Sequence, residues 1–105
     1  MTGSRCAVLG SPISHSLSPA MHRAAYRELG LDWSYDAVEI RAGGLAHFLA
    51  RSDETWRGFS VTAPLKTEAA QFASVRSADV ETLGVANTLV PVGAGWQASN
   101  TDVPG

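Results

Sequence analysis

Apolar residues along the chain follow two patterns in alternation. Some segments are short continuous runs, and others place apolar residues three or four positions apart. Runs of aliphatic, aromatic and β-branched residues bounded by Gly, Pro or polar residues are typical of strands. We expect strands over 5–9, 33–40, 57–62, 87–92 and 96–99. Apolar residues three or four positions apart predict helices between them. We expect these helices over 18–29, 45–49, 64–72 and 77–83, with Met21, Ala25 and Leu29 on one side of the first.

This alternation predicts an α/β fold, a three-layer sandwich around a mostly parallel sheet with an antiparallel edge hairpin. Gly93-Ala94-Gly95 marks the turn of that hairpin. In such sheets ligands bind beyond the carboxyl ends of the strands. Polar loops fall at those ends over 11–18, 62–66 and 100–102. Pairing outward from the hairpin turn brings Asn87 beside residues 100–102. The alternative is that Asn87 and Asn100 only cap turns.

Lys66 is the only lysine in the chain, and the other seven strongly basic residues are arginines. Arginine stays protonated at any accessible pH, whereas a lysine can lose its proton in a suitable environment. Pro64 is expected to open a helix, which places Lys66 in the first helical turn. The helix dipole there favours the neutral amine. Lys66 is therefore a candidate proton-transfer residue, and the alternative is a surface lysine without a role.

Four serines occur within eight positions of the first polar loop, at Ser11, Ser14, Ser16 and Ser18. Ser18 followed by Pro19 predicts a capped helix start. Hydroxyls beside a helix amino terminus can bind a carboxylate. We interpret His15 as a residue that braces the loop. The alternative is that serines other than Ser18 are solvated turn residues.

Composition excludes several classes of protein. A chain of 105 residues is one domain, and a net charge of −2 gives no argument for nucleic acid or an anionic membrane. Only 17% of residues are charged, so we expect part of the surface to face another domain or a second subunit, as in a homodimer. No signal peptide or membrane-length run is visible, and we expect a cytoplasmic protein. Cys6 is interpreted as a buried, unreactive thiol.

Two features of the sequence could suggest a cofactor or metal site, and neither has the required context. The pattern Gly93-x-Gly95-x-x-Ala98 loosely matches a dinucleotide fingerprint, but it joins two predicted strands instead of a strand and a helix. The three histidines lack metal-ligand spacing, so we expect no metal site.

Four segments together resemble the signatures of the shikimate dehydrogenase family, specifically of its substrate-binding domain. They read GSPISHSLSPAMH at 10–22, VTAPLK at 61–66, GVANTL at 84–89 and NTD at 100–102. The four segments occur in the order and at the spacing of the family, and the resemblance covers essentially the whole chain. Two positions depart from the usual pattern, because Ser60 stands where the family usually has Asn, and Ser99 where it often has Asp.

The resemblance implies an NADP-dependent reversible reduction of 3-dehydroshikimate to shikimate in aromatic amino acid biosynthesis. It implies that Ser16 and Ser18 hold the substrate carboxylate. It also implies that Thr62, Asn87 and the catalytic pair Lys66 and Asp102 surround the hydroxyls. That assignment agrees with the chemistry, because hydride delivery to a carbonyl creates an alkoxide that needs a proton donor.

Members of this family are about twice as long and bind NADP in a second, carboxyl-terminal Rossmann domain. We therefore expect residues 1–105 to form the substrate-binding domain, to lack a cofactor site and to be inactive alone. One alternative is a sensor that binds quinate or shikimate without turnover, although Lys66 and Asp102 favour the enzyme. Another is a dehydrogenase with a different preference, for quinate or an amino-substituted analogue.

Overall fold

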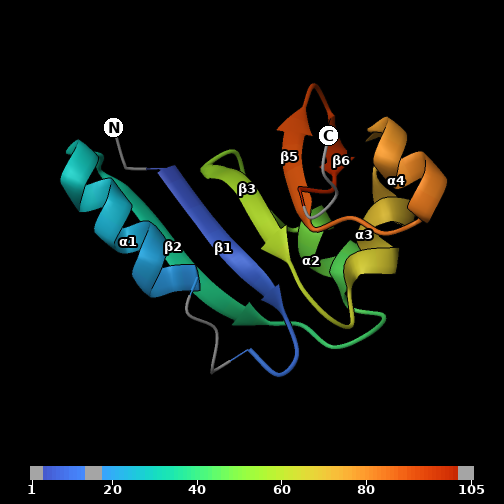
Figure 1. Ribbon diagram of the computed structural model, residues 1–105, viewed down its shortest axis with the longest axis horizontal. Helices are drawn as coiled ribbons and strands as arrows, with labels where there is room; N and C mark the ends of the chain where they lie inside the picture. The colour runs from blue at the N-terminus through green and yellow to red at the C-terminus, as the bar shows by residue number, and fades with distance from the viewer. Residues whose placement is uncertain (1–3, 14–17, 102–105) are drawn as a thin grey trace.

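The computed structural model describes residues 4–13 and 18–101, with the backbone alone at Ser18 (Figure 1). Its strands form one sheet in the order β2-β1-β3-β5-β6-β4. They are β1 Ser4–Gly10, β2 Trp33–Glu39, β3 Trp56–Val61, β4 Val75–Arg76, β5 Thr88–Val92 and β6 Gly95–Ser99. β1 is parallel to β2 and β3, β4 is parallel to β6, and β5 runs antiparallel between β3 and β6. The predicted mixed, mostly parallel sheet is confirmed.

The predicted hairpin forms, but it does not lie at the edge of the sheet. β5 and β6 pair around a two-residue turn, and the short strand β4 then pairs with the outer side of β6. The backbone amides of Ser74 and Ser77 donate to the carbonyls of Trp96 and Ala98, at 3.0 and 3.1 Å. Two residues are too few to show an apolar period, so the sequence did not predict β4.

Helices cover both faces of the sheet, which gives the three layers that the alternation predicted. They are α1 Ser18–Leu29, α2 Leu45–Ala50, α3 Lys66–Phe72 and α4 Ala78–Leu83. Successive strand residues point to opposite faces. Ala7 and Leu9 pack in the main core with residues of α2, α3 and α4, whereas Val8 belongs to a second core with Tyr35. Figure 1 shows α1 beside β2, away from the other helices.

The apolar side of α1 noted in the sequence does not pack against the sheet. Met21 and Leu29 are 68% and 71% exposed, and Ala25 is exposed as well. The helix packs instead through His22, whose ring stacks on that of buried Tyr35 with centroids 4.1 Å apart, and through Tyr26. Flat rings lie closely over the strand residues, and this contact outweighs the aliphatic spacing.

The end of α4 follows the sequence signal for a helix stop, whereas the start of α3 differs from the one predicted. Pro64 does not open α3, because the helix begins at Lys66 and Pro64 lies in the preceding turn. The first-turn position predicted for Lys66 is nevertheless confirmed. α4 ends at Leu83, and Gly84 caps it with a φ of +73°, a left-handed conformation that glycine adopts without strain.

Cys6 is half-buried, and not fully buried as predicted. Its burial nevertheless raises the pKa of the thiol, which disfavours the reactive thiolate at neutral pH. The lack of reactivity expected for Cys6 stays a prediction.

Candidate functional site

Four chain segments meet at one end of the sheet, where β1, β3 and β6 finish. We call this end of the sheet the carboxyl edge. β1, β3 and β6 all point the same way, because β5 lies antiparallel between β3 and β6. Their carboxyl ends lead into the loops that begin at Ser11, Thr62 and Asn100, and Asn87 immediately precedes β5 at the same edge. The sequence predicted this convergence, and the described part of each loop confirms it.

Thr62 is held against the end of β1 by a close approach of two backbones. Its amide donates to the carbonyl of Leu9 at 2.9 Å, and the amide of Ser11 donates to the carbonyl of Ala63 at 3.1 Å. Gly10 lies between these bonds, where a side chain would collide with the Thr62 methyl group and lie 2.9 Å from the Ala63 carbonyl oxygen. Only glycine fits at position 10 without a clash, and this allows Thr62 to pack against the end of β1.

We expect Gly10→Ala to displace the 62–66 segment and to destabilise the fold by about 1–3 kcal/mol, as overpacked sites do. Thermal unfolding measures the loss. Thr62→Ser removes the colliding methyl group and keeps the hydroxyl, so combining it with Gly10→Ala should recover part of the stability. A single Gly10→Ala variant as stable as the parent would contradict this packing.

Lys66 is half-buried at the first position of α3. Its backbone carbonyl accepts a hydrogen bond of 2.9 Å from the amide of Ala86. The same helix start is tied to the turn before α2, because the Glu68 carboxylate accepts from the Gly43 amide at 2.7 Å. These bonds fix the backbone of Lys66 beside Ala86, the residue before Asn87. The backbones of Lys66 and Asn87 are therefore close together.

Asn87 links the ends of β3, β5 and β6. Its amide side chain donates to the Thr101 hydroxyl at 2.9 Å and accepts from the Thr101 backbone amide at 3.0 Å and from the Thr88 hydroxyl at 2.9 Å. Its backbone also bonds to Val61 and Ser99. Both lone pairs of the side-chain oxygen are thus used, which leaves one N–H for another partner. The predicted pairing of Asn87 with the 100–102 segment is confirmed at Thr101.

Other predicted site residues lie at the limits of the described chain. Ser16 and Asp102 fall outside the described residues. Ser18 begins α1, which confirms the helix start within one residue, but its side chain is also outside the description. The roles assigned to these three residues stay predictions.

Some contacts at this edge were not predicted from the sequence. The Ser11 hydroxyl donates to the Glu39 carboxylate at 2.9 Å, which ties the serine loop to the end of β2. The Tyr35 hydroxyl donates to Ser60 at 2.7 Å. Thr101 belongs to a quoted signature but was given no role. The bond to Glu39 had no signal in the sequence, because the strand was expected to run on to Ile40, whereas β2 ends at Glu39.

The structure adds three negative observations for the described residues. Gly93 and Ala94 form the turn between β5 and β6, so this glycine pattern is not a dinucleotide loop. No group of three or more His, Cys, Asp or Glu side chains over 4–13 and 18–101 could hold a metal ion. In the same ranges no helix is long and apolar enough to cross a membrane.

Comparison with known proteins defines the class. Residues 8–89 match the family model described as shikimate dehydrogenase substrate binding domain. The chain belongs to this family.

Individual relatives agree with the family match. A protein of Aeropyrum pernix named shikimate dehydrogenase (NADP(+)) is 42% identical over 96% of this chain and 37% of its own length. The crystal structure of Mycobacterium tuberculosis shikimate dehydrogenase is 48% identical, with a TM-score of 0.90 over 94% of this chain and 38% of that one. A Thermus thermophilus shikimate 5-dehydrogenase, solved with NADP(H) and shikimate, is 39% identical with a TM-score of 0.89, covering 96% and 39%. The chain therefore spans less than two fifths of the length of these relatives.

Proposed function

We propose that this chain is the substrate-binding domain of an NADP-dependent shikimate dehydrogenase, which interconverts 3-dehydroshikimate and shikimate. The observation that supports the proposal most is the meeting of Thr62, Lys66 and Asn87 at the carboxyl edge of the sheet in a member of this family. These residues offer a hydroxyl, an amine and an amide, which suit a small polyhydroxylated ring.

The substrate carboxylate is assigned to the serine loop. Ser16 and Ser18 supply hydroxyl donors beside the start of α1, and hydroxyls and backbone amides at a helix start suit an anion. The ring hydroxyls then face Thr62 and the one N–H of Asn87 that Thr101 does not use. This arrangement orients the reacting carbon toward Lys66.

Proton transfer is assigned to the Lys66 Nζ. During reduction the carbonyl oxygen gains negative charge, and the Lys66 ammonium donates a proton to form the hydroxyl. The neutral amine then takes a proton back from water, or from the substrate hydroxyl in the reverse direction. Asp102 is proposed to orient the ammonium, and Asn87 places the neighbouring Thr101 through two hydrogen bonds.

We propose that the described residues of this chain do not hold NADP. Their glycine-rich pattern is a hairpin turn, and it joins no strand to a helix. We therefore propose that a nucleotide-binding domain outside this chain holds NADP, which supplies the hydride. The relatives have more than half of their length beyond the matched part, which supports a further domain in this protein.

The exposed Met21, Leu29 and Leu31 side chains support a contact with another domain or with a second copy in a homodimer. We propose a cytoplasmic location, as for a soluble biosynthetic enzyme.

The test is turnover by a protein that joins this chain to its nucleotide-binding domain. NADP reduction with shikimate, measured at 340 nm and compared with quinate, should show the higher kcat/KM for shikimate. Binding of shikimate without turnover would favour a sensor. A higher kcat/KM for quinate would overturn the substrate assignment.

We expect Ser16→Ala and Ser18→Ala to raise the Michaelis constant for shikimate with a smaller effect on kcat, because they remove donors to the carboxylate. Ser18→Ala should also destabilise the protein by about 0.5–2 kcal/mol through loss of the helix cap. Steady-state kinetics and thermal unfolding measure both effects. Unchanged Michaelis constants in both variants would place the carboxylate elsewhere.

A further inference from the structure

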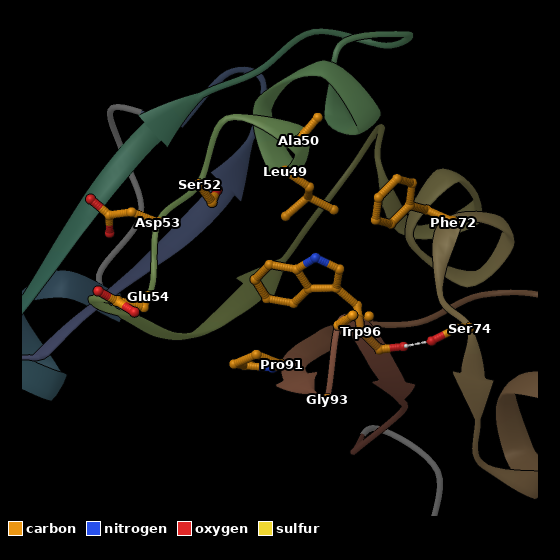
Figure 2. Close-up of a pocket in the computed structure, with 12 residues that line it drawn as sticks. Leu49, Ala50, Ser52, Asp53, Glu54, Phe72, Ser74, Pro91, Gly93 and Trp96 are labelled. Atoms are coloured by element: carbon orange, nitrogen blue, oxygen red, sulfur yellow. Dashed lines mark hydrogen bonds between the residues drawn. The ribbon is translucent and has the colours of Figure 1, made fainter.

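A pocket lies at the end of the sheet opposite the candidate site, where β3, β4 and β6 begin. It has a volume of about 460 Å³, within the range of about 300–1,000 Å³ that is typical of small-molecule sites. Its walls come from the ends of α2 and α3, the loop before β3 and the hairpin turn (Figure 2). Lys66 begins α3 and Phe72 ends it, so about 9 Å of helix separates this pocket from the proton-transfer residue.

The floor of the pocket is apolar and aromatic. In Figure 2 the indole of Trp96 lies at the centre, with Leu49, Phe72 and Pro91 around it. Trp96 is half-buried, and Phe72 is 38% exposed although it is a large apolar side chain. A flat apolar group on this floor would cover aromatic surface that now faces water.

The charge on the rim is negative. Asp53 and Glu54 both line the pocket, and no Lys or Arg is among its described lining residues. Hydrogen bonds from Thr55 and the nearby Arg5 lower the pKa of Asp53, so it stays ionised at neutral pH. Among the described residues Glu54 forms no hydrogen bond or ion pair. The face of the indole also attracts cations.

The remaining polar side chains of the pocket are already engaged. The Ser52 hydroxyl donates to the Phe48 carbonyl at 3.1 Å, and the Ser74 hydroxyl donates to the Trp96 carbonyl at 3.3 Å. The Asp53 carboxylate likewise accepts hydrogen bonds from Arg5 and Thr55. Glu54 is therefore the group that would recognise a polar end of a ligand. An anion would meet repulsion from the two carboxylates, whereas a cation would be attracted by them.

We propose that this pocket binds an organic cation with a flat apolar body, that is, an arylalkylammonium compound. The ring lies on Trp96 and Phe72, and the ammonium faces Glu54. This site is separate from the proposed shikimate site and does not depend on catalysis.

The experiment titrates tryptamine into the protein that joins this chain to its nucleotide-binding domain, with calorimetry or ligand-observed NMR. Indole-3-propionate is the matched control, because it has the same ring and linker with the opposite charge. We expect millimolar binding of tryptamine, binding of indole-3-propionate at least about tenfold weaker, and no displacement of tryptamine by saturating shikimate. Absence of tryptamine binding, equal affinity for the two indoles, or displacement by shikimate would overturn the proposal.

Two exposed substitutions locate the binding. Glu54→Gln and Phe72→Ser should each weaken tryptamine about two- to fivefold, because they remove the charge partner and part of the aromatic floor. Glu28→Gln on α1 makes the same charge change far from the pocket and should leave the affinity unchanged. If Glu54→Gln and Glu28→Gln have equal effects, the ammonium is not bound at this rim. Because these readouts are binding constants, they stand or fall independently of dehydrogenase activity.

Discussion

Lys66→Arg is expected to lower kcat by about 10² to 10⁴ while the protein stays folded. Arginine keeps the positive charge at the start of α3, but it does not release a proton at neutral pH. Loss of a general acid–base group typically has an effect of this size. Steady-state turnover of shikimate with NADP, in the protein with its nucleotide-binding domain, measures it.

The matched control for this change is Arg27→Lys, which exchanges the same two residue types at an exposed position in the last turn of α1. It should leave kcat and the Michaelis constant unchanged. Calorimetric titration should show that Lys66→Arg binds shikimate within about tenfold of the parent, since most other contacts remain. Turnover of Lys66→Arg within a few-fold of the parent would refute proton transfer by this lysine.

Asn87→Ala is expected to lower kcat/KM by about 100-fold or more. It removes the acceptor for the Thr101 amide and the donor to its hydroxyl, so the backbone next to position 102 loses its anchor. Displacement of a reacting group by about 1 Å can reduce the rate about 10²-fold. The same steady-state assay measures the effect.

Asn87→Asp separates the two roles of this side chain. A carboxylate still accepts from the Thr101 amide and the Thr88 hydroxyl, and the Thr101 hydroxyl can donate to its second oxygen. It has no N–H for the substrate. If Asn87 only positions Thr101, Asn87→Asp keeps activity near that of the parent. If its remaining N–H also binds the substrate, as we propose, the Michaelis constant rises. Parent-like kinetics of Asn87→Ala would contradict both roles.

The sequence predicts most of the sheet because its strands carry strong local signals. Each of the longer strands combines β-branched or aromatic residues with Gly or polar boundaries, and all were found within a few residues of the expected place. β4 has only two residues and depends on hydrogen bonds to β6, which are contacts between distant segments. Such pairing leaves no periodic pattern, so it could not be predicted.

The orientation of α1 shows a second limit. Counting Met21, Ala25 and Leu29 as one apolar side identified the helix, but this side does not pack against the sheet. Which side packs depends on Tyr35 and Trp33 of β2, whose rings contact His22 and Tyr26. That choice is made by tertiary contacts, which a single helix does not reveal.

The candidate site was predicted in part for a similar reason. The register of the hairpin was enough to place Asn87 beside the 100–102 segment, because it follows from counting outward from the turn. The bond between Ser11 and Glu39 joins residues 28 positions apart in sequence and depends on the order of β1 and β2. The engagement of the Asn87 oxygen by Thr101 and Thr88 likewise depends on side-chain geometry.

The most direct test of the proposed site is a titration of shikimate against the assigned amide spectrum of the protein that contains this chain and its nucleotide-binding domain. If the carboxyl edge of the sheet binds the substrate, the largest saturable shifts occur at Thr62, Lys66, Asn87 and Thr101. Amides around Trp96, at the opposite end of the sheet, should shift little. Shifts concentrated around Trp96, or no saturable shifts at Thr62 and Asn87, would contradict the assignment of this edge as the shikimate site.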